Sequence, residues 1–408
     1  MIAPARVTIG IITPLPIECA AMRALIDAPA PVRIPGDGNH YEIGTIPSTE
    51  PARPHVVTIT VLPEDGNRNA AAICAHMLRS FRSVRVVVMC GIAGGVPAYS
   101  DHERHVRLGD VVVAAKGIVD YDHVRTVDGV DHLRRYVGGL STDLLRAQRQ
   151  LEVQAIAGTR PWEQTLTAAM TTRFARPHAA SDILYVDGAA HPHPPDASRP
   201  ADLPRVHAAA IGSADRLLRD AVRRDELAAR YGIRAVEMEA SGVAVAAGLQ
   251  GIGWYVVRGI ADYCDNATKN DAWHPYASFV AAAYLRALLG ACHPLDASAD
   301  GNASPPDHQG RLPLQGLRAI ARALQEIDLM NEPAGRLLLL SLLPREIGGN
   351  VPSDSRDWVH LLHIVRTCAR YPHGRESLVE ALETVAAESS DGLRSARAAI
   401  VHHWPAAA

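Results

Sequence analysis

The chain has 408 residues, enough for two or three domains and a sizeable core. Lysine and arginine number 41 against 44 acidic residues, a formal charge of −3 that excludes a strongly basic nucleic-acid binder. No apolar run approaches the roughly 20 residues that cross a membrane, and no signal-peptide cleavage site is present. The six scattered cysteines form no CxxC pair, as in reducing compartments. We therefore expect a cytoplasmic protein that binds neither membrane nor nucleic acid.

The first 290 residues alternate short β-rich runs with alanine-rich amphipathic stretches. Taken in chain order, the pattern predicts strands over 7–12, 56–62, 84–90, 111–115 and 253–260, and helices from about 17 and over 69–81, 238–249 and 275–289. The run 84–90 is almost continuously apolar, as in central strands covered on both faces. This alternation predicts an α/β fold around a largely parallel or mixed sheet.

Two segments interrupt these patterns. Residues 187–206 are rich in proline and histidine and are interpreted as a surface insertion or mobile loop, which leaves open whether they form a lid. Residues 292–312 are rich in proline, glycine, aspartate and serine and lack any apolar period, which predicts a flexible linker. Behind it, residues 313–405 carry helical stripes separated by turns and no strand pattern. We expect a small bundle of four or five helices that serves docking, because it contains no catalytic or metal-ligating pattern.

Four segments of the first half carry chemically useful residues near the ends of predicted strands: 9–18, 89–96, 235–240 and 256–265. They contain, in this order, a carboxylate after a turn, a glycine-rich turn, two acids flanking a methionine, and an acid-bearing loop. Each alone has an ordinary structural explanation, such as a tight turn or a solvated helix start. Together they lie where α/β folds bind ligands, at the carboxyl ends of strands.

The motifs IGII with a following glutamate, CGIAGG, LGDVVV, AVEMEA and VVRGIADYCD resemble the nucleoside phosphorylase superfamily. The resemblance covers residues 6–290 and is strongest to the branch of the methylthioadenosine and S-adenosylhomocysteine nucleosidases. The stretches PAGRLLLLSLLP and CARYPHGRESLVEAL are similar to the death-like effector-associated domains of prokaryotic conflict systems. The resemblance implies a three-layer α/β/α catalytic domain over 1–291 and a helical effector-associated domain over 313–405.

The resemblance also assigns roles in breaking an N-glycosidic bond. Asp262 matches the family acid that protonates the leaving purine at N7, and Glu18 matches the carboxylate that orients and deprotonates the attacking water. Glu239 matches the acid that binds the ribose 2′ and 3′ hydroxyls. The other substrate-binding positions implied are Ala93, Gly94, Leu217, Leu218, Glu237 and Met238. Neither a metal nor a cofactor is implied.

Hydrolysis and phosphorolysis differ in what lies beside the glycine-rich turn. Phosphorylases of this superfamily bind phosphate there through arginine and serine, whereas the matching positions are Met89 and Ile92. Neither side chain binds an anion, and Glu18 would repel one. The residues therefore favour water as the nucleophile.

This sequence departs from the nucleosidases in two ways. Leu217 and Leu218 stand where an aromatic side chain stacks on the base, so the purine would be covered without stacking. Arg68, Arg216 and Lys269 add charge near the expected pocket and are candidates for binding substrate phosphates. The alternative for all three is a solvated surface position.

We therefore predict a purine nucleosidase acting on an adenine nucleoside or nucleotide, with ATP as one candidate. The chain would act as a defence-type effector, recruited by a protein partner through its helical domain, and would form a homo-oligomer. Two alternatives stay open, an idle nucleotide sensor or adaptor and a phosphate-dependent phosphorylase. His191, His193 and His207 are interpreted as loop residues rather than metal ligands, because no acids accompany them.

Overall fold

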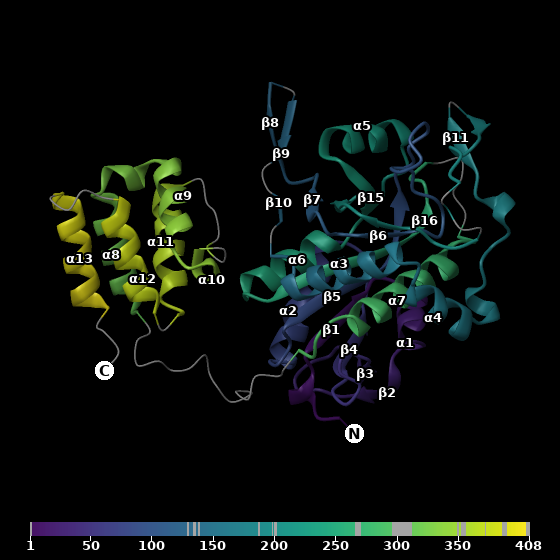
Figure 1. Ribbon diagram of the computed structural model, residues 1–408, viewed down its shortest axis with the longest axis horizontal. Coiled ribbons are helices and arrows are strands. Elements are labelled where there is room, and N and C mark those ends of the chain that lie inside the picture. The colour runs from purple at the N-terminus through teal and green to yellow at the C-terminus, as the bar shows by residue number, and fades with distance from the viewer. Residues whose placement is uncertain are drawn as a thin grey trace. The chain divides into compact units, whose positions relative to one another are not determined.

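The computed structural model describes residues 2–128, 130–133, 136–137, 139–186, 188–197, 199, 202–265, 271–295, 312–348, 351, 356–371, 373–385 and 390–404. The chain divides into two compact units, Met1–Gly301 and Asn302–Ala408. Each unit is described by itself below, and both are drawn in Figure 1.

The N-terminal unit mixes strands and helices. Its strands are β1 (Ile9–Thr13), β2 (Asp27–Val32), β3 (Tyr41–Ile46), β4 (His55–Val61), β5 (Val86–Gly95), β6 (Val111–Val113), β7 (Ile118–Asp120), β8 (Val124–Val127), β9 (Val130–Leu133), β10 (Tyr136–Val137), β11 (Leu184–Val186), β12 (Ala189–His191), β13 (Val206–Ala208), β14 (Ala210–Ser213), β15 (Ile233–Glu237) and β16 (Gly253–Asp262). Its α-helices are α1 (Pro16–Arg23), α2 (Asn67–Ser80), α3 (Thr142–Ile156), α4 (Pro161–Ala169), α5 (Ala221–Tyr231), α6 (Ala240–Leu249) and α7 (His274–Gly290). Short 3-10 turns occur at Pro4–Arg6, Thr172–Phe174 and Ala179–Ser181.

A mixed sheet forms the centre of this unit. Its longest path runs β10-β7-β14-β15-β5-β1-β4-β3-β2, and β16 joins it by pairing with β5 and β6. The ten-residue strands β5 and β16 run parallel through the middle, from Gly253 beside Val86 to Asp262 beside Gly94. β1 lies parallel to both β4 and β5, whereas β15 meets the end of β5 antiparallel. The expected mixed sheet is confirmed.

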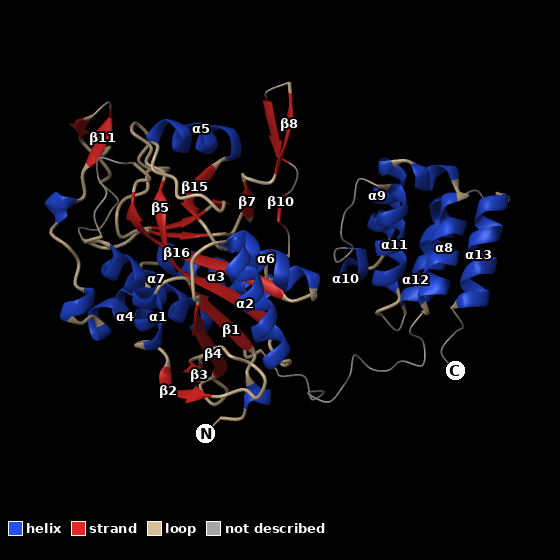
Figure 2. Cartoon of the chain, turned by 180° about the vertical axis from the view of Figure 1, so that it is seen from behind, coloured by secondary structure: helices blue, strands red, loops and turns tan. Residues whose placement is uncertain are grey.

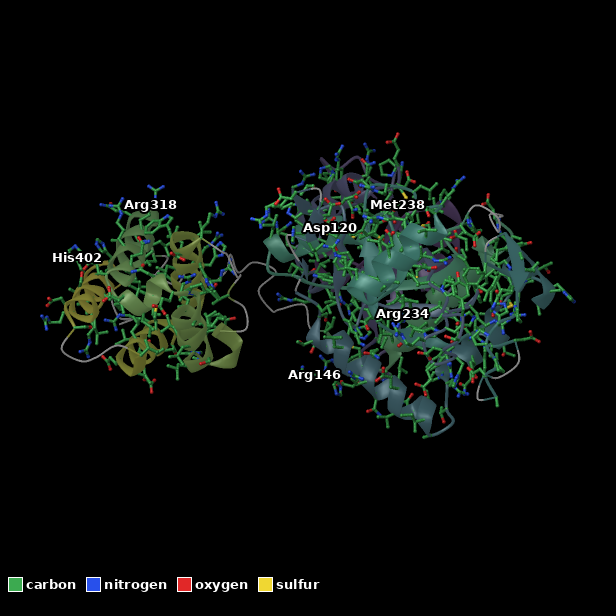
Figure 3. All side chains as sticks on the ribbon, turned by 90° about the horizontal axis from the view of Figure 1, so that it is seen from above. Asp120, Arg146, Arg234, Met238, Arg318 and His402 are labelled. Carbon is green, nitrogen blue, oxygen red and sulfur yellow. The ribbon has the colours of Figure 1, made fainter. Side chains whose placement is uncertain are left out.

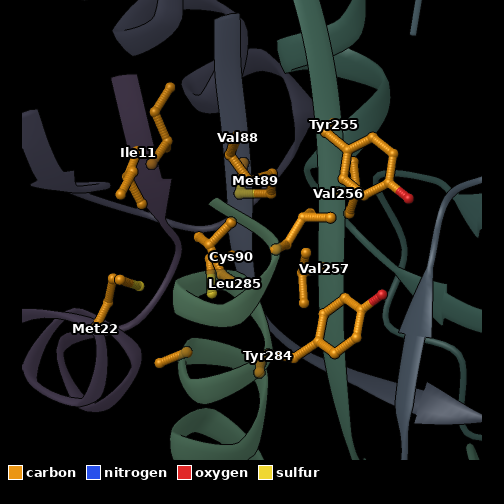
Figure 4. Close-up of a cluster of buried hydrophobic side chains, with 14 of the residues drawn as sticks. Ile11, Met22, Val88, Met89, Cys90, Tyr255, Val256, Val257, Tyr284 and Leu285 are labelled. Atoms are coloured by element: carbon orange, nitrogen blue, oxygen red, sulfur yellow. The ribbon is translucent and has the colours of Figure 1, made fainter. Parts of the chain in front are cut away.

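Helices cover both faces of the sheet and make three α/β/α layers, as expected. Helices α1, α3 and α4 pack around α7 on one side, and α2 packs against α6 on the other (Figures 1 and 2). β5 and β16 are buried along nearly their whole length, which explains their largely apolar sequences. Figure 4 shows their side chains meeting those of α7, α1 and β1 in the core, with the labelled residues Ile11, Met22, Val88, Met89, Cys90, Tyr255, Val256, Val257, Tyr284 and Leu285.

The fold brings the four chemically interesting segments to one place. β1 leads into the turn before α1, and the carboxyl ends of β5 and β16 pair with each other at Gly94 and Asp262. The carboxyl end of β15 reaches the same point, because Val236 pairs with Gly94. The parallel strands β1, β5 and β16 expose their carboxyl ends at a common edge, and the antiparallel pairing of β15 with β5 brings a loop from a distant part of the sequence to the same edge.

Helix α6 begins two residues later than the sequence pattern predicts. It starts at Ala240 rather than at Met238. The Glu237 carboxylate accepts hydrogen bonds from the backbone N–H groups of Ala240 (2.9 Å) and Glu239 (3.1 Å), which are first-turn donors without partners inside the helix. Met238 and Glu239 therefore lie in the connection before the helix, facing the convergent edge.

The interpretation of 187–206 as a surface insertion holds for its described residues only in part. β12 pairs with β11 in a separate two-stranded sheet, but Arg199 forms a salt bridge with the fully buried Asp110. His193 Nδ1 lies 2.9 Å from His105 Nε2, and its other ring nitrogen lies 2.9 Å from the backbone oxygen of Asp182. The described part of the insertion is therefore anchored to the domain through buried polar contacts.

The C-terminal unit is helical throughout its described residues. It contains α8 (Leu314–Gln325), a 3-10 turn at Asp328–Asn331, α9 (Pro333–Leu342), α10 (Arg345–Gly348), α11 (Asp357–Cys368), α12 (Gly374–Val385) and α13 (Asp391–His403). Its apolar stripes close into a core of their own, and the buried Arg336 is held by Asp357 (2.8 Å) and the Met330 carbonyl (2.9 Å). None of the helices in the described part of the chain has the length and hydrophobicity needed to cross a membrane.

Candidate active site

A single buried arginine organises the convergent edge. Arg258 lies on β16 with no exposed surface, and its Nη2 group bonds to the carboxylates of Glu237 and Glu239, the latter at 3.1 Å. Its Nη1 and Nε groups have no hydrogen-bond partner among the described residues. An unpartnered donor on a buried guanidinium is costly, so it marks a place where a water or a substrate atom completes the site.

Glu18 lies on the other side of this arginine. It occupies the first turn of α1, where its carboxylate accepts hydrogen bonds from the backbone N–H groups of Leu15 (2.5 Å) and Ile92 (2.7 Å). Burial raises the pKa of Glu18 from 4.5 to about 7, although the charge of Arg258 and the two N–H groups oppose the rise. A carboxyl group with this pKa takes up and releases a proton near neutral pH, as a general base must.

Gly91 explains how Glu18 and Arg258 come so close. A Cβ atom on Gly91 would lie within 2.6 Å of both Glu18 Oε1 and Arg258 Nη1. Those two atoms are therefore at most about 5 Å apart, because both lie so near one point. Only glycine leaves this space, and the unpartnered Nη1 group opens onto it.

Glu239 lies at the N-cap of α6 and faces the start of α2. Its Oε1 accepts a hydrogen bond from the backbone N–H of Gly66 (3.2 Å), while Oε2 pairs with Arg258. Burial and the neighbouring charge of Glu237 raise the pKa of Glu239 to about 7 against the opposing charge of Arg258. Glu237 is engaged with Arg258 and the α6 N-terminus, so it holds the arginine in place.

Asp262 is half-buried at the end of β16. Its Oδ1 accepts a hydrogen bond from the backbone N–H of Cys264 (2.8 Å). A Cβ on Gly94 would lie within 2.8 Å of Asp262 Oδ1 and closer still to Cys264 Sγ, so glycine is required there. The structure thus places Ala93 and Gly94 beside the expected acid, with Ala93 buried in β5.

A polar network ties together the helix ends that surround the site. Asn67 Oδ1, in the first turn of α2, accepts hydrogen bonds from Ser213 Oγ (3.1 Å) and from the backbone N–H of Gly242 (2.8 Å). Ser241 Oγ donates to Asp120 Oδ2 at 2.6 Å. Asp120 and the half-buried Met238 are labelled in Figure 3. These bonds connect α2, β14, α6 and β7, and they hold in place the loops that carry Gly66 and Glu239.

The remaining predicted site residues lie further out. Leu217 is 62% exposed, and the half-buried Leu218 packs beside the small core under α5. Arg68 is exposed and 3.7 Å from Asp215, whose other oxygen accepts the N–H of Asn67. Arg216 pairs with Asp122. Lys269 lies outside the described residues.

Arg258 is the main residue that sequence reasoning missed. It stands inside the apolar run of β16, where a charged side chain must find buried partners. That anomaly was a usable signal, and the nearby acids of AVEMEA were the available counter-charges. Around the histidines of the insertion, the described residues contain no group of three or more side chains arranged to hold a metal ion.

Family comparison agrees with this geometry. The model of the family described as the phosphorylase superfamily matches residues 8–289. The chain belongs to the phosphorylase superfamily. A second model, described as effector-associated domain 2, matches residues 321–400. Both parts of the resemblance noted in the sequence are confirmed.

Individual proteins are similar to this chain over about two thirds of its length. A nucleotide-binding leucine-rich repeat (NLR)-like protein of Hyaloscypha variabilis is 31% identical over 312 residues, covering 71% of this chain and 30% of the relative. The ATP nucleosidase Cap17 of Escherichia coli is 28% identical over 281 residues, covering 67% and 49%. This chain thus spans about half or less of the length of these two relatives. A 5′-methylthioadenosine/S-adenosylhomocysteine nucleosidase structure from Neisseria meningitidis matches with a TM-score of 0.47 and 17% identity, covering 69% of this chain and 98% of that one.

Proposed function

We propose that the N-terminal unit hydrolyses the N-glycosidic bond of a purine nucleoside or nucleotide. The observation that carries the proposal is that a buried carboxyl group, Glu18, lies within about 5 Å of the unpartnered Nη1 donor of Arg258. A water molecule between them would donate a hydrogen bond to the carboxylate and accept one from the guanidinium. Such a water is oriented and activated at the same time.

The two ends of the scissile bond would be handled by different carboxyl groups. Asp262 would transfer a proton to N7 of the leaving base, so the base takes the electron pair of the breaking bond and leaves as a neutral purine. Glu18 would accept a proton from the water as its oxygen bonds to the ribose carbon. The sum is one water consumed, with free base and the (phospho)ribosyl product released.

The ribose would be bound by Glu239. Its carboxylate is held by Arg258 and Gly66 N–H, and its remaining lone pairs can accept from the 2′ and 3′ hydroxyls. Met238 would pack on the sugar, and Ala93 and Gly94 would line the pocket of base and ribose. Glu237 would act indirectly, by holding the Arg258 side chain in place.

The charge at the site favours water over phosphate as nucleophile. Three carboxyl groups (Glu18, Glu237 and Glu239) share one guanidinium, so an incoming phosphate would be repelled. Met89 is fully buried and Ile92 uses its N–H for Glu18, so neither offers an anion site in the fold. This supports hydrolysis over phosphorolysis.

ATP is the substrate we favour. The E. coli relative named as an ATP nucleosidase supports this choice, as do the arginines Arg68 and Arg216 near the α2 N-terminus. Both arginines are exposed and paired with exposed or half-buried acids, so phosphates could replace those partners at little cost. Lys269 and the cover by Leu217 and Leu218 belong to the same proposal.

The C-terminal unit would recruit the enzyme. We propose residues 1–291 as a catalytic domain, 292–312 as a linker and 313–405 as the effector-associated domain that binds a helical partner. In this proposal the chain is a cytoplasmic homo-oligomer in an antiphage defence system, and recruitment limits the loss of cellular nucleotide. The match to effector-associated domain 2 supports it.

The test is release of free adenine by the full chain. The protein is incubated with ATP, AMP, adenosine or methylthioadenosine, with and without phosphate, and products are resolved by chromatography. We expect adenine without phosphate, lost in Glu18→Gln and Asp262→Asn but kept in the exposed control Glu226→Gln. Release only with phosphate would establish a phosphorylase. Binding of ATP without release by the wild type, alone and with its partner, would establish a sensor.

A further inference from the structure

Helix α5 carries a buried arginine that points at the segment bearing Asp262. Arg224 is 1% exposed, whereas the next residue toward the N-terminus, Arg223, has a 42% exposed side chain. Nη1 of Arg224 donates a hydrogen bond to the backbone oxygen of Tyr263 (2.5 Å), and Nη2 of Arg224 donates one to the Tyr99 hydroxyl (2.6 Å). Its Nε pairs with Asp225 at 2.7 Å. All three nitrogens of this guanidinium are therefore engaged.

The contact with Tyr263 acts on Asp262 through one peptide group. The oxygen of Tyr263 and the N–H of Cys264 belong to the same planar trans peptide and point in opposite directions. Arg224 binds the oxygen, and the N–H donates to Asp262 Oδ1 at 2.8 Å. Fixing the oxygen therefore fixes the direction of the hydrogen bond that orients the Asp262 carboxylate.

This peptide needs an external hold because its conformation is unfavourable. Cys264 has φ +52°, in the left-handed region that a non-glycine residue enters at a cost of about 1–2 kcal/mol. The Tyr263 side chain is held separately, since its hydroxyl donates to Asp182 at 2.6 Å. That bond fixes the ring but leaves the peptide after it free to rotate. Arg224 is the described group that holds the carbonyl.

We infer that Arg224 is a positioning residue, which holds the Tyr263–Cys264 peptide so that Asp262 faces the leaving base. The inference rests on the proposed function for its catalytic consequence, but the hold itself can be measured without any substrate. Because α5 directly follows the segment of Leu217 and Leu218, one helix connects the expected cover of the base with the acid that protonates it.

The experiment compares Arg224→Met with two controls in the full chain. Tyr99→Phe removes the other Nη contact but leaves the peptide held, and Arg223→Met removes an exposed arginine of the same helix. The first readout is the alkylation rate of each cysteine with N-ethylmaleimide, mapped by mass spectrometry. Cys264 is 4% exposed and Cys90 is 2% exposed, so Cys90 reports general loosening of the fold. The second readout is kcat and KM for adenine release.

We expect Arg224→Met to raise the ratio of Cys264 to Cys90 labelling about tenfold, because the released segment opens locally. We expect kcat to fall about 10- to 100-fold with little change in KM, because only the transition state uses the positioned acid. Both controls should resemble the wild type, and Arg224→Lys should recover part of kcat.

An unchanged labelling ratio would overturn the hold whatever the activity. A raised ratio with unchanged kcat would overturn its catalytic role. If Arg224→Met raises the labelling ratio but the wild type itself never releases adenine, the hold is supported and the proposed function is refuted.

Discussion

Replacing Glu18 with glutamine should change the stability of the protein in a way that reverses with pH. Glu18 has an ordinary pKa of 4.5 when unfolded and about 7 when folded. A carboxyl group whose pKa is raised by folding costs nothing below the unfolded pKa, because it is protonated in both states. As pH rises from 4.5 to about 7, the unfolded state loses its proton first, so the wild type is progressively destabilised.

The magnitude follows from those two values. The interval from 4.5 to about 7 corresponds to about 3 kcal/mol, of which about 2–3 kcal/mol develops between about pH 5 and about pH 8. Glutamine cannot ionise, so Glu18→Gln lacks this loss. The free energy of unfolding of the variant, relative to the wild type, should therefore rise by about 2–3 kcal/mol over that range.

A second effect is independent of pH. The two Glu18 oxygens accept N–H groups from Leu15 and Ile92, and an amide has only one oxygen to offer. One buried N–H then faces the amide NH2 group, which costs about 1–3 kcal/mol. The variant should thus be less stable than the wild type at about pH 5 and equal or more stable at about pH 8.

The assay is urea unfolding followed by tryptophan fluorescence at both pH values. Glu226→Gln on the exposed face of α5 is the control and should track the wild type. Unfolding of the C-terminal unit contributes equally to all variants and cancels in the difference. If wild type and Glu18→Gln show the same pH dependence, Glu18 is ionised throughout in the folded site, and the reasoning for a near-neutral base is refuted.

The other predictions concern the same site and the second unit. When kcat/KM for adenine release is measured from about pH 5 upward, it should rise with pH through about 7, because Glu18 acts as the base in its ionised form. Arg258→Met should abolish release and lower the free energy of unfolding by about 3–5 kcal/mol, because it leaves buried carboxyl groups without a counter-charge. Gly94→Ala should lower both activity and melting temperature, whereas Gly248→Ala, which meets open space in helix α6, should leave activity unchanged and should not lower the melting temperature. Arg336→Met should destabilise the C-terminal unit by about 3–5 kcal/mol in urea unfolding while adenine release by the N-terminal unit persists.

Much of the fold was predictable because its centre is apolar. The buried strands β5 and β16 appear in the sequence as near-continuous apolar runs, and α7 as a long alanine-rich stretch. Strand β2 was not predicted, since its sequence DAPAPV contains two prolines that cannot donate to a ladder. The structure places it at the end of the sheet path, where an edge strand tolerates them.

The candidate site was predictable in its acids and not in their connections. Glu18, Glu239 and Asp262 stand in recognisable motifs, and the fold brings the loops that carry them to one edge. The roles of Arg258 and Arg224 depend on groups far away in the sequence, such as Glu18 near Arg258 and Tyr99 bonded to Arg224. No local pattern encodes which carboxylate or carbonyl a buried guanidinium will meet, because the sheet register decides it.

The carboxyl groups around Arg258 lower the stability of the folded protein, and the same feature gives the site its chemistry. Burial raises the pKa values of both Glu18 and Glu239 to about 7, and the one guanidinium among three buried carboxyl groups offsets only part of this rise. A second arginine would stabilise the protein, but it would also lower the pKa of Glu18 toward its ordinary value. A carboxylate with a pKa near 4.5 is a far weaker base toward water than one with a pKa near 7. The incompletely compensated burial of Glu18 destabilises the folded site, and the same burial lets Glu18 take a proton at neutral pH.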